Sequence, residues 1–295
     1  MRKAFRICSA PAALTLILVL PAGSHAQEIS TGFDVARNGY SFPNRDWGRV
    51  CYSLNGPTQL RYDANGTFCN SGWGLCGGMS LSAGERFLAG LTCDRLSRAE
   101  SQNDIVNGQF RTLDSGTVMK FLNWITAPDV GHTLDPSHSI GYRMKLDWEN
   151  SIKPALSARK PVVLGLIFDK RAQLIDLRQA GALADLTNQH QVLGIGFKQT
   201  SQQVELRAYD PNYPKDVLLL SFTLGAPGVD QRLLSGAALT RRRPRGVMYV
   251  RSPAQPQVGV TRTPAGVCPA TRPRCCERDE NGACTLCVGS GQQCP

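Results

Sequence analysis

The feature that most constrains this chain is the order of its segments: a cysteine at the start of a helical stretch precedes every strand-like stretch. Cys76 follows a glycine-containing turn and precedes Gly77 and Gly78, and apolar residues then recur every four positions, which predicts a helix with one buried face. The other expected elements are helices at 115–125 and 148–158 and strands at 162–168, 192–197, 204–209, 217–224 and 247–250. Helices followed by a sheet predict the α+β fold class.

The first 26 residues predict a cleaved signal peptide. Basic residues at the start precede an apolar run from Pro11 to Leu20, and Ser24-His25-Ala26 fits a small-residue cleavage site. The apolar run is too short to span a membrane, and no later run is longer. We therefore expect a secreted or periplasmic protein with no transmembrane segment, whose mature chain starts at Gln27.

The formal charge is +10, and the three basic residues of the leader account for 3 of it, which leaves +7. Much of the excess lies in the run Arg241-Arg242-Arg243-Pro244-Arg245 and in the last 30 residues or so. Aromatic residues are not interleaved with these charges, so we interpret them as solvated loop charge and expect no nucleic-acid partner. Attraction to an acidic envelope surface is the alternative reading.

Cysteines are concentrated at the end of the chain. Ten of the 11 cysteines remain after removal of the leader, and six lie in the last 28 residues: Cys268, Cys275, Cys276, Cys284, Cys287 and Cys294. A short exported segment of this kind is expected to be a disulfide-rich tail, although Cys284-x-x-Cys287 would suit zinc or redox chemistry in a cytosolic protein. Residues 251–267 are rich in Pro and Gly and predict a linker, so the expected domains are 27–250 and 268–295. Residues 171–187 predict a helix or a covering loop.

A histidine and an aspartate lie on two consecutive expected strands. If strands 192–197 and 204–209 pair about a turn centred on Ser201, Val192 faces Asp210, and His190 and Asp210 become diagonal neighbours on one sheet face. A register shift of one residue would separate them. The small residues that share this face, such as Gly194, would let the Cys76 helix pack closely against it.

Three short motifs surround the candidate residues: Gly74-Leu-Cys-Gly-Gly-Met79, His190-Gln-Val-Leu-Gly194 and Tyr209-Asp-Pro-Asn-Tyr-Pro214. Together they resemble a group of secreted bacterial papain-like proteins of the cysteine-peptidase superfamily. The resemblance implies a papain-like fold, with N-terminal helices packed on an antiparallel sheet. It also implies roles for four residues: Cys76 as nucleophile, His190 as general base and then acid, Asp210 as the group that orients the imidazole, and Asn70 as oxyanion donor, where papain relatives carry Gln.

The thiol chemistry has a physical basis in this arrangement. A free thiol titrates near ~8.5, and a helix N-terminus beside an imidazolium lowers that value by a unit or more. Gly77 and Gly78 would let backbone N–H groups and substrate come close to the sulfur.

Each candidate residue also has a structural alternative. Cys76 could be bridged to Cys69 or Cys51, whereas Cys93 would lie about 25 Å away along the helix, against the ~7 Å that a disulfide allows. His190 could be a buried histidine with satisfied hydrogen bonds, and Asp210 could only form an Asx-turn. His132, His138, Asp129 and Asp135 give a weak metal-binding pattern, and we expect neither a metal nor another cofactor.

The leading functional hypothesis is an exported thiol hydrolase that cleaves peptide or isopeptide amides of a peptide or protein substrate through a Cys thioester. The same triad would serve an acyltransferase or a deamidase. The alternative from another class is a non-catalytic binding or adhesion protein. In that case the papain-like domain is a scaffold, and the cysteine-rich tail is the interaction surface that attaches the protein to the cell envelope.

Overall fold

The computed structural model describes the chain in several stretches: residues 26–45, 47, 50–54, 60–62, 68–70, 74–130, 136–168, 188–239, 241–254, 274–278 and 284–288. In 50–54, 60–62, 68–70, 274–278 and 284–288, and at residue 136, only the backbone is described. The expected signal peptide, the segment 171–187 and most of the expected linker and tail lie outside the described residues.

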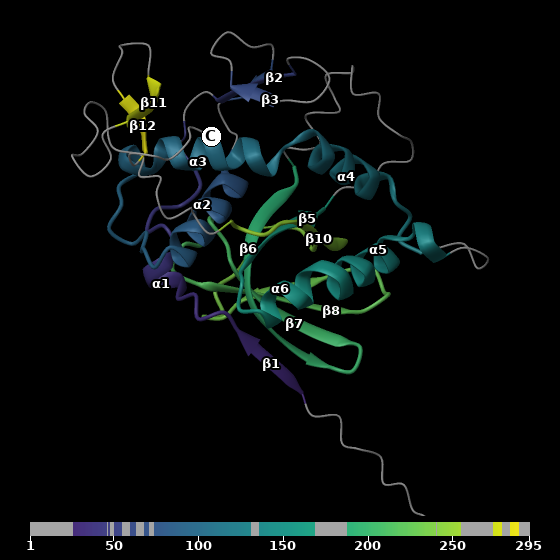
Figure 1. Cartoon of the computed structure of the whole chain (residues 1–295). Coiled ribbons are helices and arrows are strands. Elements are labelled where there is room, and N and C mark those ends of the chain that lie inside the picture. Colours follow the sequence, from purple (N-terminus) through teal and green to yellow (C-terminus); the bar gives the residue numbers. More distant parts are fainter. Residues whose placement is uncertain are drawn as a thin grey trace, which may run out of the picture.

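A seven-stranded antiparallel sheet forms the centre of the molecule (Figure 1). Its strands are β1 (Gln27–Ser30), β5 (Val162–Ile167), β6 (His190–Thr200), β7 (Gln203–Tyr209), β8 (Val217–Thr223), β9 (Asp230–Leu233) and β10 (Gly246–Arg251). The order is β10-β5-β6-β7-β8-β9, and β1 pairs with the second half of β6, beyond the end of β5. The sheet and the helices confirm the predicted α+β class.

The helices precede most of the sheet in the chain. They are α1 (Val35–Asn38), α2 (Cys76–Leu88), α3 (Arg98–Thr112), α4 (Ser115–Thr126), the 3-10 turn η1 (Pro136–His138), α5 (Ile140–Asp147), the π-helical turn η2 (Trp148–Ile152) and α6 (Lys153–Ser157). The expected helices from Cys76 and over 115–125 are confirmed as α2 and α4. The expected helix at 148–158 is instead the end of a longer helical stretch that begins with α5, and α3 was not expected.

Helices cover both faces of the sheet, and each face has its own core (Figure 1). Helix α2 packs on the face that carries Leu193 and Ile195, whereas α4, α5, η2 and α6 pack on the face that carries Val192. The expectation that α2 packs on the Val192 and Gly194 face is therefore wrong. The space beside Gly194 is filled from within the sheet, because a Cβ there would lie 2.9 Å from Leu164 Cδ1.

A β-bulge sets the register of β6 against β7. The strands are joined by a turn of only two residues, with Thr200 opposite Gln203, rather than by the longer loop expected. The register shifts between Gly194 and Gly196, so that Leu193 lies opposite Tyr209. Because a one-residue shift moves side chains to the other face, this bulge restores the register that was expected at the site end of the hairpin.

Two smaller β elements place cysteine backbones opposite each other. In the sheet of β2 (Val50–Leu54), β3 (Leu60–Tyr62) and β4 (Phe68–Asn70), Cys51 is the register partner of Cys69. In the hairpin of β11 (Arg274–Arg278) and β12 (Cys284–Val288), Cys275 is the partner of Cys287. The first pairing sets Cys51 and Cys69, the two alternative disulfide partners of Cys76, opposite each other. The second sets two cysteines of the expected disulfide-rich tail opposite each other.

The main domain continues past β10 into the first residues of the expected linker. Pro253 is buried, and a Cβ on Gly84 of α2 would lie 2.5 Å from its ring. In the described part of the chain, no helix is both long and apolar enough to span a membrane.

Candidate functional site

The start of α2 is held by side chains from outside the helix. Its N-cap residue, Leu75, has no side chain that can cap the first turn, and its own N–H donates to Asn44 Oδ1 at 2.6 Å. Gln109 of α3 accepts from the Gly78 N–H at 2.9 Å. These amides replace the Ser, Thr or Asp that usually caps a helix, and they fix Cys76 at the first helical position.

The glycines after Cys76 make room for protein rather than for substrate. A Cβ on Gly77 would lie 2.1 Å from Gln191 Oε1 and 2.3 Å from Thr112 Oγ1, and one on Gly78 would lie 1.9 Å from the Ile105 carbonyl oxygen. The expectation that these glycines open the sulfur to substrate is therefore corrected. Gly78 lets the backbone of α3 approach the first turn of α2, and Gly77 leaves room for the side chains of Gln191 and Thr112.

The structure brings Cys76, His190 and Asp210 together. His190 Nε2 lies 2.7 Å from Asp210 Oδ1, which leaves Nδ1 for the hydrogen bond between His190 and the Cys76 thiol. The backbone N–H of Gln191 also donates to the Cys76 sulfur, at 3.4 Å. His190 and Asp210 are buried, and Cys76 is a half-buried free thiol. The contact between His190 and Asp210 is the one that the hairpin register predicts.

Asp210 is fully buried and both of its oxygens are used. Oδ1 accepts from the backbone N–H of Asn212 at 2.9 Å in addition to its contact with His190. Oδ2 accepts from Arg241, which lies in the loop between β9 and β10 and passes over the Tyr213 ring. The Asx-turn alternative is therefore also present, since one carboxylate caps the turn and binds the imidazole.

Part of the arginine run is structural, which corrects its interpretation as solvated loop charge. The Arg241 side chain is 19% exposed and pairs with Asp210, and that of Arg245 is 13% exposed and pairs with Asp129 at 2.7 Å. Arg245 also donates to the carbonyl of Ala127 at 2.7 Å. Arg242 and Arg243 are exposed and fit the expectation better; the Arg243 side chain is 62% exposed and pairs with Asp230, whose side chain is 73% exposed.

The pKa shifts of the three groups favour charge separation. Burial would raise the pKa of the Cys76 thiol, but the charge and hydrogen bond of His190, the Gln191 N–H and Arg241 lower it below its ordinary value. Burial would lower the pKa of His190, yet Asp210 and Cys76 raise it above the ordinary value against the opposing charge of Arg241. Despite burial, His190, Arg241 and the Asn212 N–H lower the pKa of Asp210 to about 2. Together these shifts favour a thiolate beside an imidazolium.

Asn44 joins the turn after Asp210 to the start of α2. Its side-chain Nδ2 donates to Asn212 Oδ1 at 3.2 Å, and its backbone N–H donates to the Pro211 carbonyl at 2.9 Å. A Cβ on Gly74 would lie 2.2 Å from Asn44 Nδ2, so glycine is needed at that position. Asn44 and Gln109 could not be predicted from the sequence, because a lone amide in a loop or helix has no distinctive pattern.

The remaining candidate residues are not assembled into a described site. Asn70 lies in β4, where its side chain is outside the description, as are His132 and Asp135. His138 is exposed in η1, and Asp129 pairs with Arg245. Among the described residues, no group of three His, Cys, Asp or Glu side chains could hold a metal ion.

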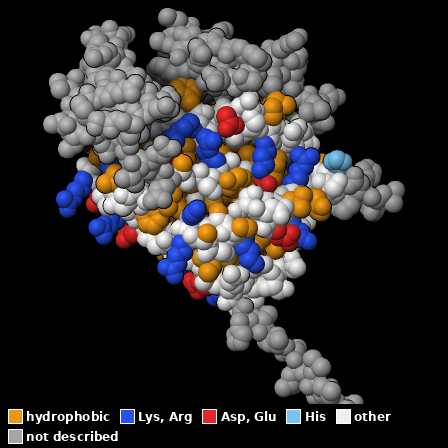
Figure 2. All heavy atoms as spheres, viewed as in Figure 1, with side chains coloured by type: hydrophobic (Ala, Val, Ile, Leu, Met, Phe, Trp, Pro, Cys, Tyr) orange, Lys and Arg blue, Asp and Glu red, His pale blue; other side chains and the backbone are white. Residues whose placement is uncertain are grey.

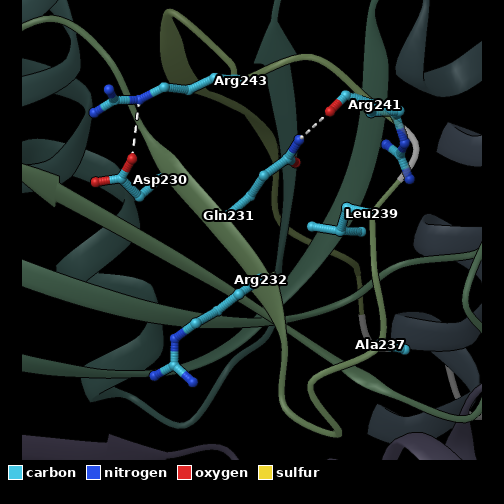
Figure 3. A pocket seen from close by; sticks show the side chains of 7 residues that line it. All are labelled: Asp230, Gln231, Arg232, Ala237, Leu239, Arg241 and Arg243. Carbon is cyan, nitrogen blue, oxygen red and sulfur yellow. Dashed lines mark hydrogen bonds and ion pairs between the residues drawn. The ribbon is translucent and has the colours of Figure 1, made fainter.

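An open pocket of about 330 Å³ lies beside the Arg241 loop (Figure 3). It is lined by Asp230, Gln231, Arg232, Ala237, Leu239, Arg241 and Arg243. Figure 3 shows the Gln231 amide directed to the Arg241 carbonyl and the ion pair of Asp230 with Arg243. On the face seen in Figure 2, basic side chains are dispersed among hydrophobic and neutral ones.

No family model, curated protein or solved structure matches the chain. The class of protein is therefore defined by its own fold and residues. It is an α+β domain in which a cysteine at a helix start, a histidine at the start of a strand and a buried aspartate are joined by hydrogen bonds.

Proposed function

We propose that this protein is an exported, papain-like thiol hydrolase that cleaves peptide or isopeptide amides. The observation that carries the proposal is the hydrogen-bonded series Cys76, His190 and Asp210, with the thiol at the start of α2. Nucleophilic thiol catalysis requires such a series: a nucleophile, a base within hydrogen-bond reach and a third group that orients the base. Assignment to the papain-like class is part of the proposal and is supported by the chain order of these residues and by helices that precede the sheet.

The chemistry follows from the charge state of the pair. The Cys76 thiolate adds to the amide carbonyl, and the imidazolium of His190 gives its proton to the leaving amine as the C–N bond breaks. A water then adds to the thioester while His190 takes one of its protons, and the thiolate leaves with release of the carboxylic acid. Asp210 keeps the ring oriented and stabilises its positive charge. In this proposal the Asn70 amide donates to the oxyanion.

The leader and the tail extend the proposal beyond the main domain. The leader supports a secreted or periplasmic location. We propose that the six cysteines of the tail form disulfides and that the tail attaches the protein to the cell envelope. The register of β11 with β12, which sets Cys275 opposite Cys287, supports one such bridge.

The proposal is tested by turnover of a peptide mixture. The mature protein is incubated with a diverse set of peptides, and new amino termini and released ammonia are measured by mass spectrometry and by a coupled assay. We expect new termini with the native protein and none with Cys76→Ala. A Cys93→Ala variant is the matched control, because Cys93 is free, buried and remote from His190 in the hydrogen-bond pattern.

Other outcomes separate the related activities. Ammonia without new termini would indicate a deamidase, and transfer of an acyl group to an added amine would indicate an acyltransferase. If Cys76 is alkylated readily but no peptide, glutamine side chain or acyl donor is turned over, the hydrolase proposal fails and the scaffold alternative gains support.

A further inference from the structure

Among the described residues, two cationic side chains contact Asp210: that of His190 and that of Arg241. Arg241 comes from the loop between β9 and β10, far along the chain from both Cys76 and His190. Its guanidinium reaches a carboxylate that has no exposed surface, and the Tyr213 ring lies 5.7 Å from it. Arg241 also lines the open pocket (Figure 3), and its side chain is 19% exposed whereas that of Asp210 is 0% exposed.

The charges of the four groups can be counted in each protonation state. When the thiolate and the imidazolium are both present, Asp210 and Arg241 balance and the whole cluster is neutral. With one proton more the cluster carries a single positive charge, and with one proton fewer a single negative charge. A buried cluster is most stable when it is neutral, so Arg241 favours the state in which Cys76 and His190 hold one proton between them, which is the proton count of the thiolate–imidazolium pair.

We propose that Arg241 is a positioning residue of this site, which through Asp210 makes the thiolate–imidazolium state electrically neutral and so sets the pH range over which that state exists. The inference rests on the proposed function only in that the thiolate–imidazolium pair is taken to be the catalytic pair. Its physical content concerns the titration of Cys76 and His190 and can be measured without any substrate.

The electrostatic surroundings agree with this role. Arg241 lowers the pKa of Cys76, of Asp210 and of His190, although in each case burial is the largest influence and acts separately. Among the described residues, Tyr209 of β7 is a further titratable group beside Asp210, and burial raises its pKa well above the ordinary value, so it stays neutral.

The test compares the pH dependence of the native protein with that of Arg241→Gln. The alkylation rate of Cys76 by iodoacetamide reports the thiolate, and an NMR titration of the His190 ring reports the imidazolium. Without Arg241 the same two deprotonations take the cluster from neutral to one and then two negative charges, instead of from one positive charge to neutral and then one negative charge. Both midpoints should therefore move up by about one pH unit, which lowers the alkylation rate about tenfold below the lower midpoint.

The sign of the shift separates an electrostatic role from a merely structural one. If Arg241 only held Asp210 in place, its loss would resemble Asp210→Asn, which should lower the His190 midpoint because Asp210 raises it. Arg241→Lys keeps the charge and should stay close to the native midpoints. Arg243→Gln removes an exposed arginine of the same loop and pocket and should leave both midpoints unchanged, since solvent screens its charge.

If Arg241→Gln folds poorly, a double variant still tests the proposal. Arg241→Gln combined with Asp210→Asn replaces both buried charges by amides, restores neutrality and should bring the Cys76 midpoint back toward the native value. Midpoints that stay unchanged or fall in Arg241→Gln, or that rise equally in Arg243→Gln, would overturn the proposal. So would a double variant whose Cys76 midpoint lies a full unit or more above the native one.

Discussion

The two free cysteines of the described chain lie at the start of α2 and in the segment that follows the same helix, and they have opposite environments. Cys76 begins α2, is half-buried, and has a pKa held below its ordinary value despite burial by His190, the Gln191 N–H and Arg241. Cys93 follows α2, has no exposed surface, and burial raises the pKa of its thiol to about 11. One helix thus separates a thiol that favours its charged form from one that favours its neutral form.

The difference shows that desolvation alone does not decide the state of a thiol. Both sulfurs lose water, but at Cys76 this loss is outweighed by an imidazolium and an N–H donor that point at the sulfur. At Cys93 the lowering influences of Arg86 and Tyr40 are too small to offset burial. A thiol can therefore be free and buried without being reactive, and of these two free cysteines only Cys76 has the low pKa of a reactive thiol.

The largest expected effect is the loss of this contrast in His190→Gln. Without the imidazolium, burial would dominate at Cys76 as it does at Cys93, and the thiolate fraction at pH 6 should fall by about three orders of magnitude. The measurement is the iodoacetamide alkylation rate of Cys76, read by peptide mass mapping. The matched control is His138→Gln, which changes an exposed histidine in η1 and should leave the rate unaltered.

A backbone substitution should disturb the Cys76 region through packing. In Gly78→Ala the new methyl would overlap the Ile105 carbonyl, 1.9 Å away, and would force α3 from the first turn of α2. We expect a loss of about 3 kcal/mol in the free energy of unfolding and slower alkylation of Cys76.

Gly116→Ala is the control for this change, and urea unfolding is the measurement. Gly116 lies in the first turn of α4, and a Cβ there would meet only Asp114 Oδ1, at 3.6 Å. That variant should be neutral or slightly more stable, by up to about 1 kcal/mol. Equal destabilisation by the two alanines would show that the close contact of α2 with α3 does not matter.

The smallest expected effect is acid sensitivity at Asp210. Its pKa is about 2 in the folded protein, below the ordinary value near ~3.9, so its contribution to stability is complete above that ordinary value. The contribution disappears as the pH falls from about 4 toward 2, and amounts to about 2.5 kcal/mol. Urea unfolding at several pH values should show this loss in the native protein and a flatter dependence in Asp210→Asn.

Much of the architecture could be predicted from the sequence because its signals are local. The four-residue apolar spacing predicts α2, and strand-like runs predict most of the large sheet. The alignment of His190 with Asp210 could be predicted only because two errors cancelled. The turn has two residues instead of a longer loop, and the bulge between Gly194 and Gly196 shifts the register by the missing residue.

The rest depends on contacts that no local pattern contains. Helix α3 was missed although Ser97 and Glu100 form a capping box at its start, because its sequence is polar and lacks a clear apolar stripe. Arg241 was missed because an arginine run in a loop is usually solvated, and nothing in the run distinguishes a residue that reaches a buried carboxylate. The face that α2 covers depends on how side chains within the sheet fill the space beside Gly194.

The most direct test of the account is differential labelling of the two free thiols. The protein, purified without reductant, is treated briefly with iodoacetamide at pH 6. It is then unfolded and treated with a second label, and each cysteine is assigned by peptide mass mapping. We predict that Cys76 takes the first label almost completely and that Cys93 takes only the second. A disulfide from Cys76 to Cys69 or Cys51, or equal rates at Cys76 and Cys93, would contradict it.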